Sequence, residues 1–292
     1  MIRSMLLGLV VIGLVAPVRG EEAKAAKVAA KTYEVEVSRD VDYYQGVDAD
    51  EVRHKLDIYS PKGAKNCPVI LFVHGGAWRH GAKQFLGIYE ALGKHWAKEG
   101  VVFVVPNYRL TPKVQHPEHI RDVARAFAWT HKNIGKYGGS PEQLFVCGHS
   151  AGGHLCALLA TNEKYLKAEG LGLDTIKGAM PLSGVYRIPD KSWLFDAAFG
   201  KDTDNRRDAS PQANINGKTP PFLIICADQD FPYCGKDTSE PFCKALQGKK
   251  CDASFMEIAD RNHMTLIVYA SRAGDPVADA MRQFIDRRLR SE

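Results

Sequence analysis

One serine in this chain stands where a serine can act as a nucleophile. The motif Gly-His-Ser-Ala-Gly at residues 148–152 follows an apolar run at residues 144–147 and precedes a helical stretch at residues 154–161. A Gly-x-Ser-x-Gly motif between a strand and a helix holds its serine on a tight, strained turn, where a side chain at either glycine would collide with neighbouring backbone. The helix that follows directs its free N–H groups toward the reacting centre. The motif alone occurs by chance, but this context predicts that Ser150 is a nucleophile.

A serine hydroxyl is a poor nucleophile near neutral pH unless a base takes its proton and a third group orients that base. Among the ten histidines, His263 is the best candidate for the base. It lies within the polar stretch at residues 259–264, which is expected to be a loop before the last helix. His149 and His154 flank the turn and are expected to point elsewhere, while His74 is expected to shape a glycine loop. The histidines expected on the surface or on a cap are His116, His119 and His131.

Two carboxylates are candidates for the orienting acid. Asp228 and Asp230 both follow the apolar run at residues 222–226. A carboxylate at the carboxyl end of a parallel strand, beside the serine turn, lies where ligands bind in open α/β sheets. Physical reasoning from the residues does not separate the two. The chain order of serine, acid and histidine is that of α/β-hydrolases.

A tetrahedral intermediate also needs hydrogen-bond donors for its oxyanion. Gly75 and Gly76 belong to the sequence His-Gly-Gly-Ala-Trp at residues 74–78 and leave their backbone N–H groups uncovered at the end of an apolar run. Ala151 offers the N–H that follows the nucleophile. One such donor is typically worth about 3–4 kcal/mol of transition-state stabilisation.

Apolar runs and helical patterns alternate along the chain. This order predicts an α/β fold with a mostly parallel central sheet and helices on both faces. The pattern lapses between residues 185 and 220, where a small cap insertion is expected. Strands are expected at residues 32–37, 55–59, 69–73, 101–105, 144–147, 176–182, 222–226 and 253–258. Helices are expected at residues 85–99, 120–134, 154–161 and 277–289.

Composition limits the partners. The chain has 292 residues, 45% of them hydrophobic, which suffices for one large core. The formal net charge of +5 is not gathered into a basic patch, which argues against a nucleic-acid partner. No residue spacing resembles a zinc site, so no metal and no cofactor are expected. A small molecule is the expected partner, and the oligomeric state is left open.

The first twenty residues have the pattern of a signal peptide. Arg3 precedes an apolar run at residues 5–15, and Gly20 offers a cleavage point. A bilayer span needs about 20 apolar residues, so export to the periplasm or the medium is expected, without stable membrane insertion after cleavage. Residues 21–31 are expected to be a flexible, polar leader, and the catalytic domain is expected over residues 32–292.

The seven cysteines allow two interpretations. Cys147, Cys156 and Cys226 lie in apolar patterns and are expected to be small buried thiols. In an exported protein, the late cysteines are candidates for one disulfide, which requires Cα atoms roughly 4.4–6.8 Å apart. Those candidates are Cys234, Cys243 and Cys251.

Residues 55–292 resemble an α/β-hydrolase of the esterase/lipase group that includes hormone-sensitive-lipase-like esterases, feruloyl-esterase-like proteins and kynurenine formamidases. Five sequence motifs match. They are Leu-Asp-Ile-Tyr-x-Pro at 56–61, His-Gly-Gly-Ala-Trp at 74–78, Asn-Tyr-Arg-Leu at 107–110, Gly-His-Ser-Ala-Gly-Gly at 148–153 and Asn-His at 262–263.

The resemblance implies an α/β-hydrolase fold, with Ser150 as nucleophile and His263 as base. In this group the acid commonly stands three positions after a small residue, here Ala227, which selects Asp230. Ala77 departs from the lipase-like His-Gly-Gly-Gly and favours the feruloyl-esterase-like and formamidase branches. The implied oxyanion donors are Gly75, Gly76 and Ala151.

These residues lead to the hypothesis of an exported serine carboxylesterase that hydrolyses short acyl or aryl esters through an acyl-enzyme. Trp78 is the expected substrate-binding residue, and Trp193 or Phe195 could flank a compact group from the insertion. A kynurenine-formamidase-like amidase is the nearest alternative, and the signal peptide argues against it. A non-catalytic binding protein on the same fold is disfavoured, because serine, acid and histidine are all intact.

Overall fold

A computed structural model describes residues 32–290 of the chain. The expected signal peptide and leader, residues 1–20 and 21–31, lie outside the described residues. Within residues 32–290, none of the helices combines the length and the apolar character needed to cross a bilayer.

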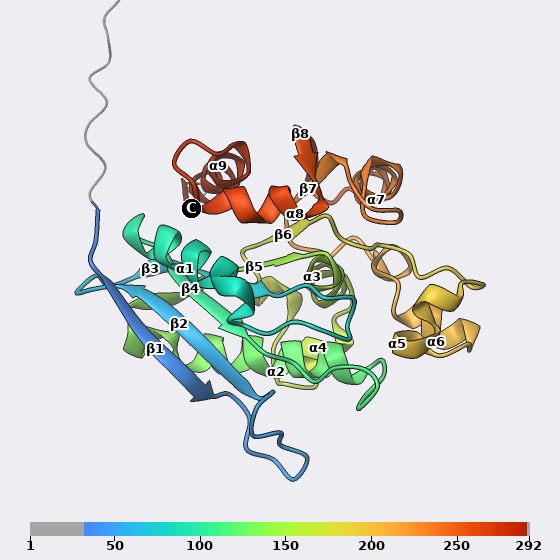
Figure 1. Cartoon of the computed structure of the whole chain (residues 1–292), viewed down its shortest axis with the longest axis horizontal. Helices are drawn as coiled ribbons and strands as arrows, with labels where there is room; N and C mark the ends of the chain where they lie inside the picture. The colour runs from blue at the N-terminus through green and yellow to red at the C-terminus, as the bar shows by residue number, and fades with distance from the viewer. Residues whose placement is uncertain (1–31, 291–292) are drawn as a thin grey trace, which may run out of the picture. The chain divides into compact units, whose positions relative to one another are not determined.

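An eight-stranded sheet with the order β1-β2-β4-β3-β5-β6-β7-β8 runs through the domain (Figure 1). β2 pairs antiparallel with β1 and β4, and every other pairing is parallel, so the expected mostly parallel sheet is confirmed. The strands are β1 Val35–Asp42, β2 Lys55–Pro61, β3 Cys67–Val73, β4 Val102–Pro106, β5 Gly139–His149, β6 Gly178–Leu182, β7 Phe222–Gln229 and β8 Ala253–Asn262.

Helices cover both faces of the sheet (Figure 1). α2 Glu118–Asn133, α3 Ala151–Thr161 and α7 Lys236–Gly248 pack on one face, and α1 Ile88–Lys98, α8 His263–Val268 and α9 Pro276–Arg290 pack on the other. The sequence did not predict α7, which contains Pro241, or α8, which has only six residues. A proline and a short span both weaken the helical pattern.

Burial differs along the sheet. All five residues of β4 are buried, as expected for a parallel strand covered on both faces. β8 lies at the edge, and most of its side chains are exposed or half-buried. Burying one valine, leucine or isoleucine side chain contributes roughly 1.5–3 kcal/mol, so a buried residue of β4 stabilises the fold more than an exposed residue of β8.

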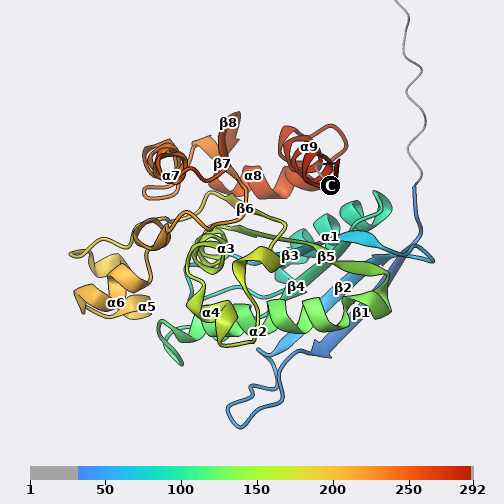
Figure 2. The same ribbon diagram turned by 180° about the vertical axis from the view of Figure 1, so that it is seen from behind.

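Residues 185–220 form short helical turns rather than a second domain. These turns are η4 Trp193–Phe195, α5 Asp196–Phe199, α6 Thr203–Asp208 and η5 Pro211–Asn214, and Figure 2 shows α5 and α6 to one side of the sheet. Asp208 fastens the segment to the rest of the domain, because it accepts hydrogen bonds from Tyr165 Oη at 2.7 Å and contacts His116 Nε2 at 2.9 Å. Phe195 is buried, whereas the Trp193 side chain is 84% exposed.

All seven cysteines lie in the described part of the chain, and all are free and buried. The disulfide for which Cys234, Cys243 and Cys251 were candidates is therefore not formed in this structure. All three of these residues belong to the hydrophobic core cluster that includes α7. The burial expected for Cys147, Cys156 and Cys226 is confirmed.

Candidate active site

The turn that carries Ser150 joins β5 to α3, and we call residues 148–152 the elbow. Ser150 has φ 58° and ψ −123°, a conformation that L-residues rarely adopt. A Cβ on Gly152 would lie 2.0 Å from the Val73 carbonyl oxygen, and one on Gly148 would lie 2.3 Å from the Gly152 carbonyl oxygen. Both positions therefore need glycine, for the reason that the sequence suggested.

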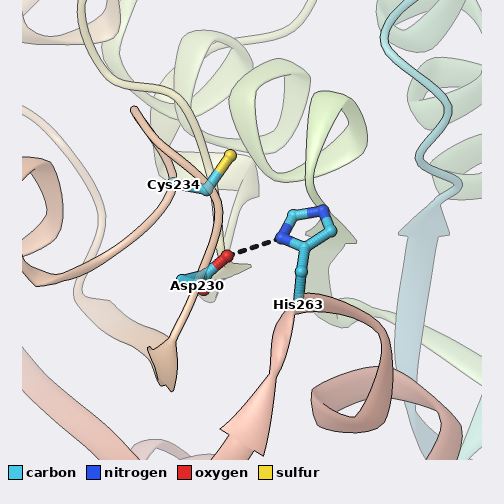
Figure 3. A group of neighbouring side chains, drawn as sticks. All are labelled: Asp230, Cys234 and His263. Atoms are coloured by element: carbon cyan, nitrogen blue, oxygen red, sulfur yellow. Dashed lines mark hydrogen bonds and ion pairs between the residues drawn. The ribbon is translucent and has the colours of Figure 1, made fainter.

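His263 begins a helix instead of lying in a loop. β8 extends to Asn262, whose side chain accepts hydrogen bonds from the N–H groups of Met264 and Thr265 and so caps α8. The polar stretch at 259–264 looked like a loop because strand end and helix start are both rich in charged and amide side chains. This junction points the His263 side chain at Asp230, with Nδ1 2.6 Å from Oδ1 (Figure 3).

Asp230 is held by several donors besides His263. Its Oδ2 accepts hydrogen bonds from Ser183 Oγ at 2.5 Å and from the Ala227 N–H at 3.0 Å, and its Oδ1 accepts one from the Phe231 N–H at 2.8 Å. Burial opposes ionisation of this carboxyl, but the hydrogen bonds from His263 and Ser183 outweigh burial and lower its pKa. Asp230 is therefore a carboxylate that fixes the tautomer and orientation of the imidazole.

Asp228 lies elsewhere. Its carboxylate accepts hydrogen bonds from the backbone N–H groups of Asp260 and Arg261, at 3.0 and 2.9 Å, and its side chain is exposed. It thus ties the end of β7 to β8. The geometry separates two carboxylates that reasoning from the residue types alone left equivalent, and it places His263 beside Asp230, the one that the resemblance selected.

A cavity of about 360 Å³ opens beside the elbow, and both Ser150 and His263 line it. Gly75 and Gly76 reach it from the glycine loop, residues 74–81, which follows β3. The cavity walls are largely apolar or aromatic. These wall residues are Ala77, Phe85, Tyr89, Phe231 and Met264.

The three expected oxyanion donors are not equivalent in the structure. The Gly75 N–H already donates to the Tyr89 hydroxyl at 3.2 Å. Among residues 32–290, the N–H groups of Gly76 and Ala151 have no protein acceptor, and Ala151 is the first residue of α3, where an N–H has no intrahelical partner. Gly76 and Ala151 are therefore free to donate to an oxyanion, whereas Gly75 has a competing bond.

The structure places Trp78 in the core, away from the cavity. Its indole is 5% exposed, and Nε1–H donates to His154 Nδ1 at 3.2 Å. His154 Nε2–H in turn donates to the Ala209 carbonyl oxygen at 2.7 Å. Trp78 thus links the glycine loop to α3 and to residues 185–220. Of the described residues that line the cavity, none is Trp78 and none comes from 185–220, because the buried aromatic rings of that segment pack against Trp78 instead.

His149 lies in the site, although it was expected to point away from it. It lines the cavity, its Nε2–H donates to the His263 carbonyl oxygen at 2.9 Å, and the two imidazole rings lie 4.5 Å apart. Burial lowers the pKa of His149 to about 3, so it is neutral near pH 7 and is a positioning group for His263. His116 and His119 are buried, not on the surface as expected.

Phe231 also contributes to the site and was missed. Its ring stacks on His263 with the ring centroids 4.4 Å apart, and 58% of its side chain is exposed. The only hint in the sequence was its place directly after Asp230. Ser183, which donates to Asp230, carries no recognisable signal.

One trio in residues 32–290 has the donor atoms of a metal site, namely Asp230, Cys234 and His263, with ligand atoms within 4.8 Å of one another (Figure 3). The donors fit a metal poorly. Both Asp230 oxygens already accept hydrogen bonds, and His263 uses Nδ1 toward Asp230. Burial also raises the pKa of the Cys234 thiol to about 12, which keeps it protonated near pH 7. The trio is better described as an acid–histidine pair with a neighbouring thiol.

The sheet order, the strained serine after β5 and the acid–histidine pair at the ends of β7 and β8 define this protein as an α/β-hydrolase. Residues 56–246 match the BD-FAE family model. The chain belongs to that family, within the esterase/lipase group of α/β-hydrolases.

Two relatives from Mycobacterium tuberculosis illustrate the similarity. Esterase LipC is 31% identical over 83% of this chain, and the probable carboxylic ester hydrolase LipM is 36% identical over 75%. The chain spans 64% of the length of LipC and 54% of that of LipM. Among solved structures, esterase B from Lactobacillus rhamnosis superposes with a TM-score of 0.73 over 88% of this chain and 87% of its own, at 18% identity. That last likeness concerns the fold alone.

Proposed function

We propose that this protein is a serine carboxylesterase. The observation that carries the proposal is that Ser150 and His263 line one cavity while His263 Nδ1 lies 2.6 Å from the Asp230 carboxylate. A nucleophile, a base and an orienting acid are the groups that acyl transfer requires. The two relatives named above are described as esterases, which supports the same reaction class.

The reaction begins when His263 Nε2 takes the proton of the Ser150 hydroxyl and the serine oxygen attacks the ester carbonyl carbon. Asp230 stabilises the imidazolium that forms. The tetrahedral intermediate collapses when His263 gives its proton to the leaving alkoxide, which departs as the alcohol. Water then attacks the acyl-enzyme with His263 again as base, and the acid is released.

The oxyanion of each tetrahedral intermediate needs donors that are fixed before the reaction. The N–H groups of Gly76 and Ala151 meet this need, since they have no protein acceptor within the described residues. The positive end of α3 adds to their field, because this helix begins directly after Ser150. Preorganised donors of this kind are usually the largest single contribution to catalysis.

The substrates we propose are short acyl or aryl esters. The cavity of about 360 Å³ has Phe85 and Met264 in its wall, and none of its described lining residues comes from the segment at 185–220. A long chain gains about 0.8 kcal/mol for each CH₂ only where a wall covers it. Phe231, which is exposed beside His263, offers one aromatic face for a compact aryl group.

A panel of p-nitrophenyl esters and one aryl formamide tests the reaction and the substrate size together. We expect covalent labelling of Ser150 by a fluorophosphonate, and kcat/KM highest for acetyl to butyryl or for aryl acyl groups. A steady rise of kcat/KM to twelve or more carbons would contradict the size argument. Faster turnover of the formamide than of any ester would favour the formamidase-like amidase. A protein that is neither labelled nor active would support the binding-protein alternative.

We also propose that the protein is exported. The support is the charged, apolar and small-residue pattern of residues 1–20. Expression of the full chain with N-terminal sequencing of the secreted or periplasmic fraction tests it. A new N-terminus near residue 21 is the expected result, and an uncleaved protein confined to the cytoplasm would contradict it.

A further inference from the structure

Tyr89 occupies an unusual place for a core tyrosine. It lies in the first turn of α1, its side chain is 4% exposed, and its ring packs 5.3 Å from that of Phe72. Tyr89 nevertheless lines the cavity that Ser150 and His263 share, and its hydroxyl is bonded to Gly75, another residue of the same wall. The phenol thus combines a fixed, buried ring with a hydroxyl that is hydrogen-bonded to a residue of the cavity wall.

The Tyr89 hydroxyl accepts a hydrogen bond within the described residues but does not donate one. Its oxygen accepts the Gly75 N–H at 3.2 Å. A phenol can also donate one proton, and within residues 32–290 no protein acceptor takes that proton. Burial raises the pKa of Tyr89, so the proton stays on the oxygen near neutral pH. A buried donor with no protein acceptor is costly unless a bound molecule accepts its hydrogen bond.

Gly75, whose N–H donates to the Tyr89 hydroxyl, packs against Ser150. A Cβ on Gly75 would lie 3.2 Å from Ser150 Cβ and 3.0 Å from the His149 carbonyl oxygen, so the Gly75 backbone is packed on the elbow. The Tyr89 hydroxyl is one hydrogen bond away from that backbone. Because Gly75, Tyr89 and Ser150 all line the cavity, a carbonyl group bonded to Ser150 Oγ lies in the same cavity as Tyr89.

We propose that the Tyr89 hydroxyl is a catalytic hydrogen-bond donor to the carbonyl oxygen of the ester as that oxygen becomes an oxyanion. Gly75 then acts through Tyr89. The Gly75 N–H donates to the phenol oxygen, which polarises the phenol O–H and makes the phenol a stronger hydrogen-bond donor. The oxyanion would receive one side-chain donor in addition to the N–H groups of Gly76 and Ala151. The inference rests on the proposed esterase function.

A matched pair of tyrosines makes the test specific. Tyr108 is fully buried, and its hydroxyl donates to the His74 carbonyl oxygen at 3.1 Å. It therefore contacts the glycine loop one residue before Gly75, but it is not among the described residues that line the cavity. Tyr89→Phe and Tyr108→Phe each remove one hydroxyl from that loop. Only the first removes a donor that we assign to the oxyanion.

The measurement is kcat/KM for an aryl ester and for the matching thionoester, whose sulfur is a weak hydrogen-bond acceptor. Tyr89→Phe should lower the oxoester rate by about 10²-fold, within the usual effect of one oxyanion donor, and the thionoester rate much less. Tyr108→Phe should lower the melting temperature and leave the ratio of the two rates unchanged. Equal losses on both substrates after Tyr89→Phe, or no loss, would overturn the proposal.

A second substitution covers the case in which Tyr89→Phe fails to fold. Site-specific 3-fluorotyrosine at position 89 keeps the ring and the hydroxyl and makes the phenol a stronger donor. The oxoester-to-thionoester ratio should change by at least about twofold, and an unchanged ratio would overturn the inference. An inactive wild-type protein would instead count against the proposed esterase function, so the two failures are distinguishable.

Discussion

The elbow and the acid–histidine pair are held in place by different forces. Every residue of α3 is buried, and Gly148 and Gly152 leave no room for a side chain. β8, which ends at Asn262 directly before His263, is an edge strand with mostly exposed or half-buried residues. Close packing therefore fixes the nucleophile, whereas hydrogen bonds fix the base.

The contacts of His263 illustrate the second arrangement. Asp230 holds its Nδ1, His149 holds its carbonyl oxygen, and Asn262 caps the helix that it begins. Each of these three contacts is a hydrogen bond between polar groups. Changes at the elbow should therefore cost stability when they add volume, and changes around the base should cost mainly turnover.

The largest expected effect is the loss of the nucleophile. Ser150→Ala should lower kcat for p-nitrophenyl acetate by about 10⁶-fold, because neither His263 nor the oxyanion donors can replace the attacking oxygen. The melting temperature should stay near that of the wild type, since the change removes one oxygen and adds no atom to the packed elbow. Turnover near the wild-type rate would contradict the mechanism.

The next effect separates the two carboxylates. Asp230→Asn should lower kcat by about 10⁴-fold, because an amide does not stabilise the imidazolium and favours the wrong tautomer. Asp228→Asn is the matched control, and its kcat should stay within about tenfold of the wild type, because Asp228 contacts only backbone N–H groups. Steady-state kinetics of both variants decide the assignment, and a crippled Asp228→Asn would reverse it.

A third change tests the packing of the elbow. Gly152→Ala should lower the free energy of unfolding by about 3 kcal/mol, because its Cβ would meet the Val73 carbonyl oxygen at 2.0 Å. Gly248→Ala, at the end of α7 with nothing within 4 Å of its Cβ, should be neutral or stabilising by up to about 1 kcal/mol. Urea denaturation measures both values. Equal stabilities would mean that packing does not hold the elbow.

The smallest effect concerns the helix that His263 begins. Asn262→Ala removes the cap of α8 and should cost about 1 kcal/mol of unfolding free energy together with a several-fold loss of kcat. Asp202→Ala removes the cap of α6, where Asp202 accepts the Asn205 N–H at 2.7 Å, and should cost a similar stability without the loss of kcat. If both variants keep full turnover, the cap does not position the base.

The sequence by itself determined the alternation of strands and helices and the place of the serine turn. Both are local properties. Apolar runs such as residues 69–73 and 222–226 can be stable only when covered on both faces. The serine turn is built from five consecutive residues, and its tightness requires glycine at positions 148 and 152. The fold class and the position of Ser150 therefore followed from short stretches of sequence.

Only the tertiary structure decided where individual side chains point. The Trp78 indole is bonded to His154, 76 positions later, and the Gly75 N–H is bonded to Tyr89 on the next helix. The choice of Asp230 over Asp228 depends on how β7 and β8 pair, and the position of His149 depends on the His263 carbonyl 114 positions later. Such contacts join segments far apart in the chain, and local pattern carries no information about which partner a polar or aromatic side chain meets.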